Sequence, residues 1–144
     1  MKEKSEPYLD ASVVVALFVI DPSSARAEAF LSANSEILNV SDFGAAELSS
    51  AVARRVRTRD LTPDEGRLAF SNFDSWLARS ADRQETATAD IDAASRILRR
   101  LDVNLRTPDA LHIAIAQRIG ATLVTFDHGM AAGARALGMA VAMP

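Results

Sequence analysis

Four acidic residues are the side chains in this sequence best placed to do chemistry: Asp10, Glu47, Asp109 and Asp127. Asp10 follows a short apolar run, and Asp127 ends the apolar run 123–126. In an open parallel sheet, sites form outside the carboxyl ends of the strands, so we expect both residues at such ends. Glu47 lies within an expected helix, and Asp109 lies in the first turn of another. Taken singly, each acid is better explained as a helix cap or a solvated charge than as a catalytic residue.

If the four carboxylates converge, their mutual repulsion must be relieved. Two unit charges about 4 Å apart repel by roughly 4 kcal/mol at an effective dielectric constant of 20. Either some of the carboxylates take up protons, or a divalent cation lies between them. Oxygen ligands suit Mg²⁺ or Mn²⁺. One or two such ions would bind a phosphodiester oxygen and lower the pKa of a bound water, which is the chemistry of metal-dependent hydrolysis.

Other metal-ligating and nucleophilic residue types are scarce. The chain has no cysteine and two histidines, His112 and His128. This leaves little basis for a zinc site built by the protein and none for a cysteine nucleophile. We expect His112 to pack within its helix and His128 to lie in an exposed loop. The carboxylates therefore remain the main candidates for a site.

The elements that must position these acids follow from hydrophobic patterning. Strand-like runs, separated mostly by helical patterns, fall at Tyr8–Leu9, Ile37–Val40, Thr86–Ala89, Thr122–Phe126 and Met139–Val141. This alternation predicts an α/β fold with a parallel sheet. A length of 144 residues, of which 49% are apolar, suffices for one domain with its own core.

Helix boundaries are marked by capping chemistry. Thr62–Glu65 forms a capping box with proline at the first helical position, and Thr107–Asp109 repeats the same kind of start. Gly120 and Gly138 mark helix ends. Two helices of the predicted fold therefore have starts that can be read directly from the sequence.

Hydropathy and charge exclude several classes of protein. The apolar run 13–20 is shorter than the roughly 20 residues that a membrane-spanning helix needs. Acidic residues on both sides of this run do not fit a secretory signal, so we expect a cytoplasmic protein without a membrane partner. The net charge of −3 provides no general attraction for nucleic acid. A local basic patch would have to supply any such attraction.

Four segments occur in the order found in PIN-domain nucleases, and the chain resembles a VapC-type toxin of a type II toxin–antitoxin system over almost its full length. The segments are Tyr8–Ser12, Ala45–Leu48, Leu105–His112 and Leu123–Asp127. The resemblance implies a single PIN-like domain over residues 1–144. It also implies a three-layer α/β/α fold with a central, mainly parallel sheet of about five strands.

The resemblance further implies that all four acids converge on one metal-dependent site. Asp10 and Asp109 would be the central ligands, while Glu47 and Asp127 would hold a second ion or orient the water. The small hydroxyl residue Ser12 would support the site by hydrogen bonding. The implied cofactor is Mg²⁺ or Mn²⁺, one or two ions. The implied reaction is hydrolysis of RNA that leaves a 5′-phosphate and a 3′-hydroxyl.

Partners are also implied by the resemblance: an RNA substrate, a cognate antitoxin protein and a second copy of the chain in a homodimer. Arg54 follows Glu47 by seven residues, so it shares a helix face with Glu47 and is a candidate contact for an RNA phosphate. A solvated helix arginine is an equal interpretation. The apolar stripe Phe70, Phe73, Trp76 and Leu77 is either an interface or part of the core.

Two other classes of small α/β protein fit less well. A receiver domain needs a lysine near its last strand, whereas the only lysines here are Lys2 and Lys4. A haloacid-dehalogenase-like phosphatase needs Asp-x-Asp, whereas Asp10 is followed by Ala11 and Ser12. Two alternatives remain open within the same fold. One is an RNA-processing nuclease without a toxin role, and the other is a non-catalytic binding module.

Overall fold

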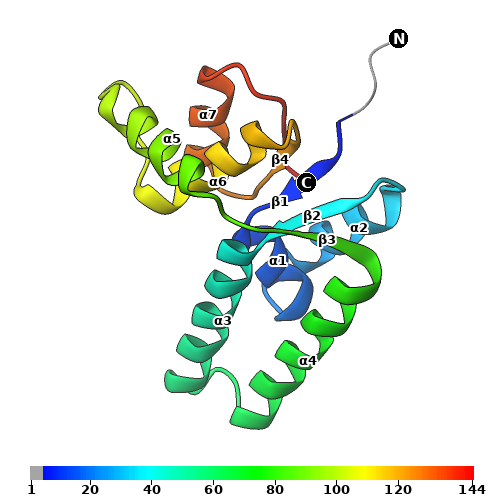
Figure 1. Cartoon of the computed structure of the whole chain (residues 1–144). Helices are drawn as coiled ribbons and strands as arrows, with labels where there is room; N and C mark the ends of the chain where they lie inside the picture. The colour runs from blue at the N-terminus through cyan, green and yellow to red at the C-terminus, as the bar shows by residue number, and fades with distance from the viewer. Residues whose placement is uncertain (1–4) are drawn as a thin grey trace.

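Within residues 5–144, the part of the chain that the computed structural model describes, five parallel strands form a central sheet (Figure 1). Lys2 and Lys4 lie outside this range. The strands are β1 (Pro7–Leu9), β2 (Leu38–Ser41), β3 (Ala81–Gln84), β4 (Thr122–Val124) and β5 (Val141–Ala142). The predicted α/β fold with a mainly parallel sheet is therefore confirmed.

The order of the strands reverses direction at the middle of the sheet. The order is β3-β2-β1-β4-β5, so the chain adds strands on one side of β1 and then crosses to the other side. Leu9 at the end of β1 pairs with Val124 at the end of β4. Ligands of open α/β sheets bind where the strand order reverses in this way. The residues that follow β1 and β4 lie at that point.

Two groups of helices cover the two faces of the sheet (Figure 1). The first group is α1 (Ala11–Phe18), α2 (Ser24–Ala33), α3 (Asp42–Arg57) and α4 (Pro63–Ser80). The second group is α5 (Thr88–Arg99), α6 (Thr107–Arg118) and α7 (His128–Ala136). The arrangement is the three-layer architecture expected from the sequence.

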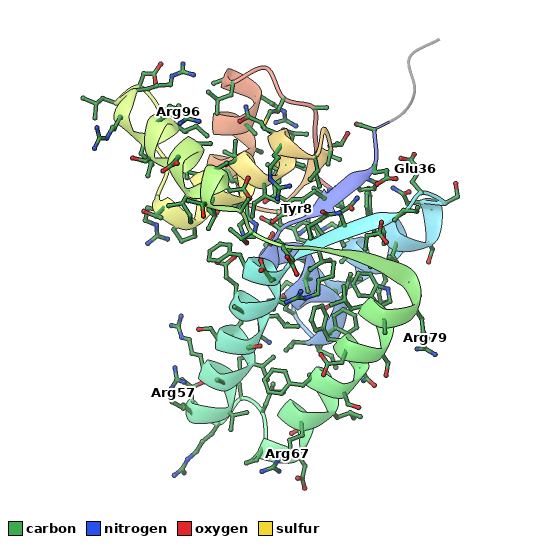
Figure 2. All side chains as sticks on the ribbon, viewed as in Figure 1. Tyr8, Glu36, Arg57, Arg67, Arg79 and Arg96 are labelled. Atoms are coloured by element: carbon green, nitrogen blue, oxygen red, sulfur yellow. The ribbon has the colours of Figure 1, made fainter. Side chains whose placement is uncertain are left out.

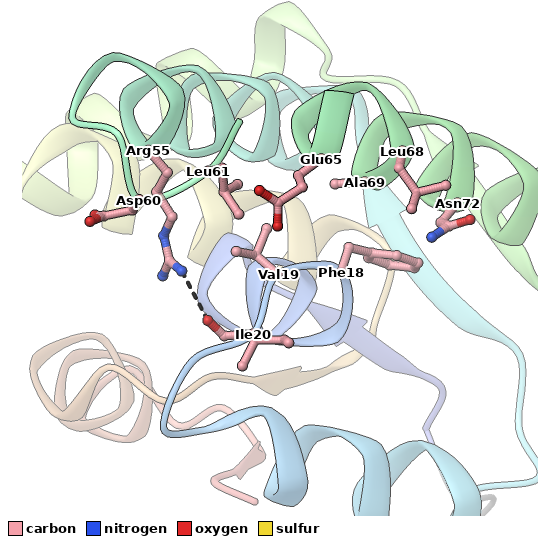
Figure 3. A pocket seen from close by; sticks show the side chains of 10 residues that line it. All are labelled: Phe18, Val19, Ile20, Arg55, Asp60, Leu61, Glu65, Leu68, Ala69 and Asn72. Atoms are coloured by element: carbon pink, nitrogen blue, oxygen red, sulfur yellow. Dashed lines mark hydrogen bonds between the residues drawn. The ribbon is translucent and has the colours of Figure 1, made fainter. Parts of the chain in front are cut away.

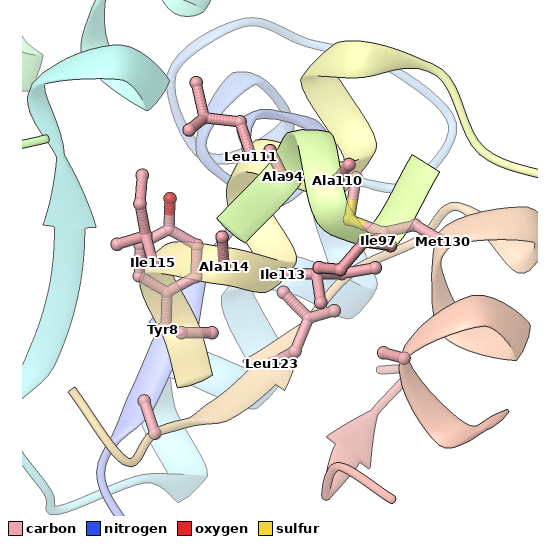
Figure 4. Packing of buried hydrophobic residues seen from close by; sticks show 13 residues of the cluster. Tyr8, Ala94, Ile97, Ala110, Leu111, Ile113, Ala114, Ile115, Leu123 and Met130 are labelled. Carbon is pink, nitrogen blue, oxygen red and sulfur yellow. The ribbon is translucent and has the colours of Figure 1, made fainter. Parts of the chain in front are cut away.

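The period-two alternation of the strands divides the core between the two faces. Tyr8 and Leu123 pack with α5, α6 and α7 (Figure 4), whereas Leu9 and Val124 pack with α1 to α4. Helix α6 is the most enclosed helix in the described chain, since every residue from 110 to 116 is buried. It therefore provides a rigid support for any side chain that it carries toward the sheet.

Local capping explains where several helices begin and end. Thr62 and Glu65 form the predicted capping box at the start of α4, with bonds of 3.1 and 3.0 Å between side chain and backbone. Helix α6 begins at Thr107, so the predicted start is confirmed. Gly120 and Gly138 follow helix ends with φ values of 68° and 80°, a left-handed conformation that favours glycine.

One predicted strand was wrong. Thr86–Ala89 is not a strand, because the backbone N–H of Thr86 donates to Oδ1 of Asp42 at 2.9 Å rather than to a neighbouring strand. The strand in this part of the chain is β3, which ends at Gln84 and is separated from α5 by three residues. Its sequence Ala-Asp-Arg-Gln is polar and partly exposed because it lies at the edge of the sheet, so it lacks the apolar pattern that identifies a strand.

The apolar stripe of α4 belongs to the core. Phe73 is buried, and Phe70, Trp76 and Leu77 pack against the core of the α1–α4 face. Arginines occupy several of the exposed helix positions instead. Arg57, Arg67, Arg79 and Arg96 extend from the outer surfaces, whereas Tyr8 lies between the two helix groups (Figure 2). No helix within residues 5–144 combines the length and apolar character that crossing a bilayer requires.

Candidate active site

Asp10 is the buried centre of the candidate site. It follows β1 and caps α1, with 1% of its surface exposed. Its Oδ1 accepts hydrogen bonds from the hydroxyl of Ser12 at 2.6 Å and from the backbone N–H of Val13 at 3.2 Å. Its Oδ2 accepts a hydrogen bond from the hydroxyl of Thr125 at 2.5 Å. A carboxylate can accept about four hydrogen bonds, so capacity for one further ligand remains.

Asp10 forms no ion pair within the described chain. Burial raises the pKa of this carboxyl, although its hydrogen bonds with Ser12 and Thr125 and the proximity of His112 counteract the shift. Among residues 5–144, no arginine, lysine or histidine forms an ion pair with it. A buried carboxylate without a cationic partner is costly. A bound cation would remove this cost, and the oxygen donors around it suit a hard divalent ion.

Two hydroxyl groups connect the turns that follow β1 and β4. The hydroxyl oxygen of Ser12 accepts a hydrogen bond from the backbone N–H of Phe126 at 3.0 Å, and the same hydroxyl donates a hydrogen bond to Asp10. The hydroxyl oxygen of Thr125 accepts a hydrogen bond from the backbone N–H of Asp127 at 2.9 Å, and this hydroxyl also donates a hydrogen bond to Asp10. The structure thereby links Asp10 to the backbone of Asp127.

The side chain of Asp127 is directed to its own helix. Its Oδ1 accepts the backbone N–H of Met130 at 2.9 Å and so caps α7. The residue is exposed to solvent, and its other oxygen, Oδ2, forms no hydrogen bond within the described chain. His128 is exposed as expected, but it begins α7 rather than lying in a loop.

Glu47 approaches the sheet from α3 and contacts α6. Its Oε1 forms a hydrogen bond with Nε2 of His112, which is 1% exposed. The other ring nitrogen of His112 lies 2.6 Å from the hydroxyl of Tyr8. Tyr8 lies in turn 2.8 Å from the hydroxyl of Ser41. The buried position expected for His112 is confirmed, and Glu47 is tied to it.

Asp109 lies in the first turn of α6, one helical turn before His112. Its Oδ2 accepts the backbone N–H of Arg106 at 3.0 Å, which closes the start of the helix. The side chain is partly exposed. Helix α6 therefore carries Asp109 at its first turn and contacts Glu47 through His112.

The structure connects the four acids only in part. Asp10 is joined to the backbone of Asp127 through Thr125, and Glu47 contacts His112 on α6, the helix whose first turn carries Asp109. Each carboxylate accepts hydrogen bonds from protein groups. Within residues 5–144, no three acidic or histidine side chains are spaced to enclose a metal ion. The donor chemistry fits a divalent cation, while the side chains themselves are directed to protein partners.

A surface groove lies away from these acids, at the far end of α1 (Figure 3). Its volume is about 480 Å³, and Arg55 crosses its rim to donate to the carbonyl of Ile20 at 3.0 Å. Helix α1 is eight residues long, so this end is about 12 Å from Asp10. Arg54 lines a neighbouring groove with Val15 and is exposed.

Sequence reasoning missed two contributors to the site. Thr125 is a fully buried hydroxyl within an otherwise apolar strand segment, and that contrast was the available signal. The contact of His112 with Glu47 had no local signal, because 65 residues separate them. Thr125 contacts Asp10 and His112 contacts Glu47, so each of them holds an acid that the sequence had already indicated.

Comparison with known proteins places these features in context. The PIN domain family model matches residues 8–136. Ribonuclease VapC46 of Mycobacterium tuberculosis is 34% identical over 147 residues, covering 95% of this chain and 96% of that protein. Two solved structures, each 18% identical, share the fold. VapC20 of Mycobacterium tuberculosis, described as a sarcin-ricin loop-cleaving toxin, has a TM-score of 0.73. The alignment covers 93% of this chain and 96% of VapC20. VapBC2 of Rickettsia felis, bound to a promoter DNA fragment, has a TM-score of 0.70. The alignment covers 96% of this chain and 98% of that chain.

Proposed function

This chain belongs to the VapC-type branch of the PIN-domain family, and we propose on that premise that it is a metal-dependent endoribonuclease acting as the toxin of a toxin–antitoxin pair. One structural observation carries the proposal. The buried carboxylate of Asp10 stands at the point where the strand order reverses, and no basic side chain in the described chain neutralises it.

Asp10 and Asp109 would be the central ligands of the cation, and Glu47 and Asp127 would hold a second ion or orient the water. Oxygen donors favour one or two Mg²⁺ or Mn²⁺ ions. Such an ion lowers the pKa of water and stabilises charge that develops on a phosphodiester. Ser12 would hold Oδ1 of Asp10 in place through its 2.6 Å hydrogen bond. Two divalent ions would also turn the net charge of −3 positive, which favours a polyanionic substrate.

RNA is the proposed substrate, because the near-full-length relative VapC46 is a ribonuclease. Hydrolysis by water would leave a 5′-phosphate and a 3′-hydroxyl, with no covalent link to the protein. Arg54 is the proposed phosphate contact, since it is exposed on the helix that carries Glu47. The distance between them along the helix is about 10.5 Å, so Arg54 would contact a phosphate other than the cleaved one.

The proposal includes two protein partners. Membership in the VapC branch implies a small antitoxin, and the VapBC2 structure among the fold neighbours supports it. A second copy of the chain would form a homodimer. A cytoplasmic location follows from this role, because the RNA and the antitoxin are both found there.

RNA cleavage by purified protein tests the proposal. Total cellular RNA is incubated with the protein and Mn²⁺ or EDTA, and the ends of the products are analysed. Wild type should cleave only with Mn²⁺, and Asp10→Asn should lose at least about 100-fold in rate because a ligand charge disappears without a change in volume. Asp92→Asn is the matched control, since Asp92 is an exposed acid on α5. Cleavage in EDTA, or full activity of Asp10→Asn, contradicts the proposal.

A further inference from the structure

A buried row of hydrogen bonds runs from the start of α3, across β1, to Glu47. The backbone N–H of Gly44 donates to the hydroxyl of Ser41 at 2.9 Å, and Ser41 lies 2.8 Å from the hydroxyl of Tyr8. Tyr8 lies 2.6 Å from Nδ1 of His112, whose Nε2 contacts the carboxylate of Glu47. No buried side-chain nitrogen or oxygen in the described chain lacks a partner, so every group in this row is satisfied.

The direction of these bonds follows from what each group can donate. Ser41 accepts a hydrogen bond from the backbone N–H of Gly44, which leaves its own hydroxyl proton free for a hydrogen bond to Tyr8. Tyr8 keeps its proton, because burial raises the pKa of its hydroxyl far above the ordinary value. That proton is directed to Nδ1 of His112. The ring then carries its proton on Nε2 and donates it to the carboxylate, which can only accept.

The His112 ring has little freedom to move. Its centroid lies 5.7 Å from that of Tyr8 and 5.0 Å from that of Phe43, and its surface is 1% exposed. It also projects from α6, whose residues 110–116 are all buried. Both the position of the ring and the placement of its proton are therefore set by packed neighbours.

Glu47 differs from His112 in this respect. Its side chain is 30% exposed, and within residues 5–144 its hydrogen bond with His112 is the one that it forms. A glutamate has three rotatable side-chain bonds and samples several rotamers when nothing holds its carboxylate. Asp10, by contrast, accepts three hydrogen bonds. The orientation of Glu47 therefore depends on His112.

We propose that His112 is a positioning residue for Glu47, held by the hydroxyl of Tyr8 so that the N–H of Nε2 is directed to the carboxylate. The inference deepens the proposed nuclease function and rests on it, because Glu47 is a ligand there. By orienting Glu47, His112 restricts the carboxylate before a divalent cation arrives. Hydrogen-bond partners of this kind change metal affinity by about 10- to 100-fold when they are removed.

Nitrogen-15 NMR of the whole protein tests the tautomer directly and needs no RNA. His128→Asn serves as the background, because it leaves His112 as the one histidine in the sequence. The spectrum should show a proton on Nε2. Tyr8→Phe, which keeps the aromatic ring, should produce a mixture of tautomers. A ring with its proton on Nδ1 and none on Nε2 would overturn the proposal.

Calorimetric titration of the protein with Mn²⁺ tests the consequence for binding. In His112→Gln the amide nitrogen approximates Nε2 and can still donate to Glu47, whereas in His112→Asn the amide is too short to do so. The Asn variant should bind Mn²⁺ about 10- to 100-fold more weakly, and the Gln variant should stay within about threefold of wild type. Equal affinities for both variants would overturn the proposal.

Two controls separate the possible failures. Circular dichroism shows which variants fold, and if the His112 variants do not, Tyr8→Phe replaces them with an expected loss of Mn²⁺ affinity of about 10-fold. Unchanged affinity in a folded Tyr8→Phe would count against the inference. If wild type cleaves no RNA, the proposed function fails, whereas the tautomer and the Mn²⁺ affinities still decide the role of His112.

Discussion

The hydroxyl of Thr125 lies 2.5 Å from Oδ2 of Asp10, although 115 residues separate them in the chain. The two residues meet because β1 pairs directly with β4 and each residue lies just beyond its strand. Both are buried. The contact therefore joins the two turns that define the middle of the sheet and orients the acid on which the candidate site is centred.

Thr125→Val should destabilise the protein by about 1–3 kcal/mol, because a buried carboxylate and a backbone N–H each lose a partner. The substitution keeps the side-chain volume. It should also raise the pKa of Asp10 further, since the hydrogen bond from Thr125 counteracts the effect of burial. Urea denaturation and carbon-13 NMR of Asp10 measure the two effects. Thr125→Ser retains the hydroxyl and should leave the pKa of Asp10 near that of wild type; an equal rise in both variants would contradict this account.

Substitutions at Asp109 should distinguish its role as a helix cap from a role in cation binding. Without metal, Asp109→Asn should unfold close to wild type, because the amide oxygen can still accept the backbone N–H of Arg106 and one negative charge is removed. Asp109→Ala should lose about 1 kcal/mol, because it cannot accept this bond. Urea denaturation in EDTA measures both variants. A large loss in the Asn variant would mean that the charge itself stabilises the start of α6.

Asp90 and Arg118 form an ion pair that should govern stability in acid. Their contact is 2.8 Å, with side chains 2% and 36% exposed. Burial tends to raise the pKa of Asp90, but the bonds from Arg118 and the N–H of Ala87 outweigh it and lower the pKa below the ordinary 3.8. The pair therefore stabilises the fold above pH 3.8, and this contribution is lost as the pH falls through the lowered pKa.

Asp90→Asn should accordingly cost about 1–3 kcal/mol at pH 7, after allowance for the exposure of Arg118. The difference from wild type should shrink below about pH 4. Urea denaturation at a series of pH values measures it. A difference that stays constant down to pH 2 would show that hydrogen bonding to the amide, rather than charge, explains the loss.

Gly133→Ala should destabilise α7 despite the better helix propensity of alanine. A Cβ at this position would lie 2.8 and 2.9 Å from the two methyl carbons of Leu105. Overpacking of this kind costs about 1–3 kcal/mol, which exceeds the gain of about 1 kcal/mol in propensity. A double-mutant cycle with Leu105→Ala, measured by thermal unfolding, should show that the two substitutions are favourably coupled. Additive effects would rule out the contact as the cause.

The sequence predicted most of the elements, because the signals for them are local. The runs that became β1, β2, β4 and β5 are apolar, and the start of α4 is marked by Thr62 and Glu65. The polar edge strand β3 was missed because only its neighbour β2 makes Ala81–Gln84 a strand. Hydrogen bonds to an existing strand can stabilise a segment whose own residues carry no strand pattern.

Residue types limit the possible chemistry, because the chain has four acids beside expected strands and helix starts, no cysteine and two histidines. Which of these groups meet depends on the folded arrangement. Thr125 donates to Asp10, and His112 contacts Glu47 across 65 residues. Periodicity assigns a residue to one face of its own element, but contact between distant elements depends on the strand order, which no local pattern encodes.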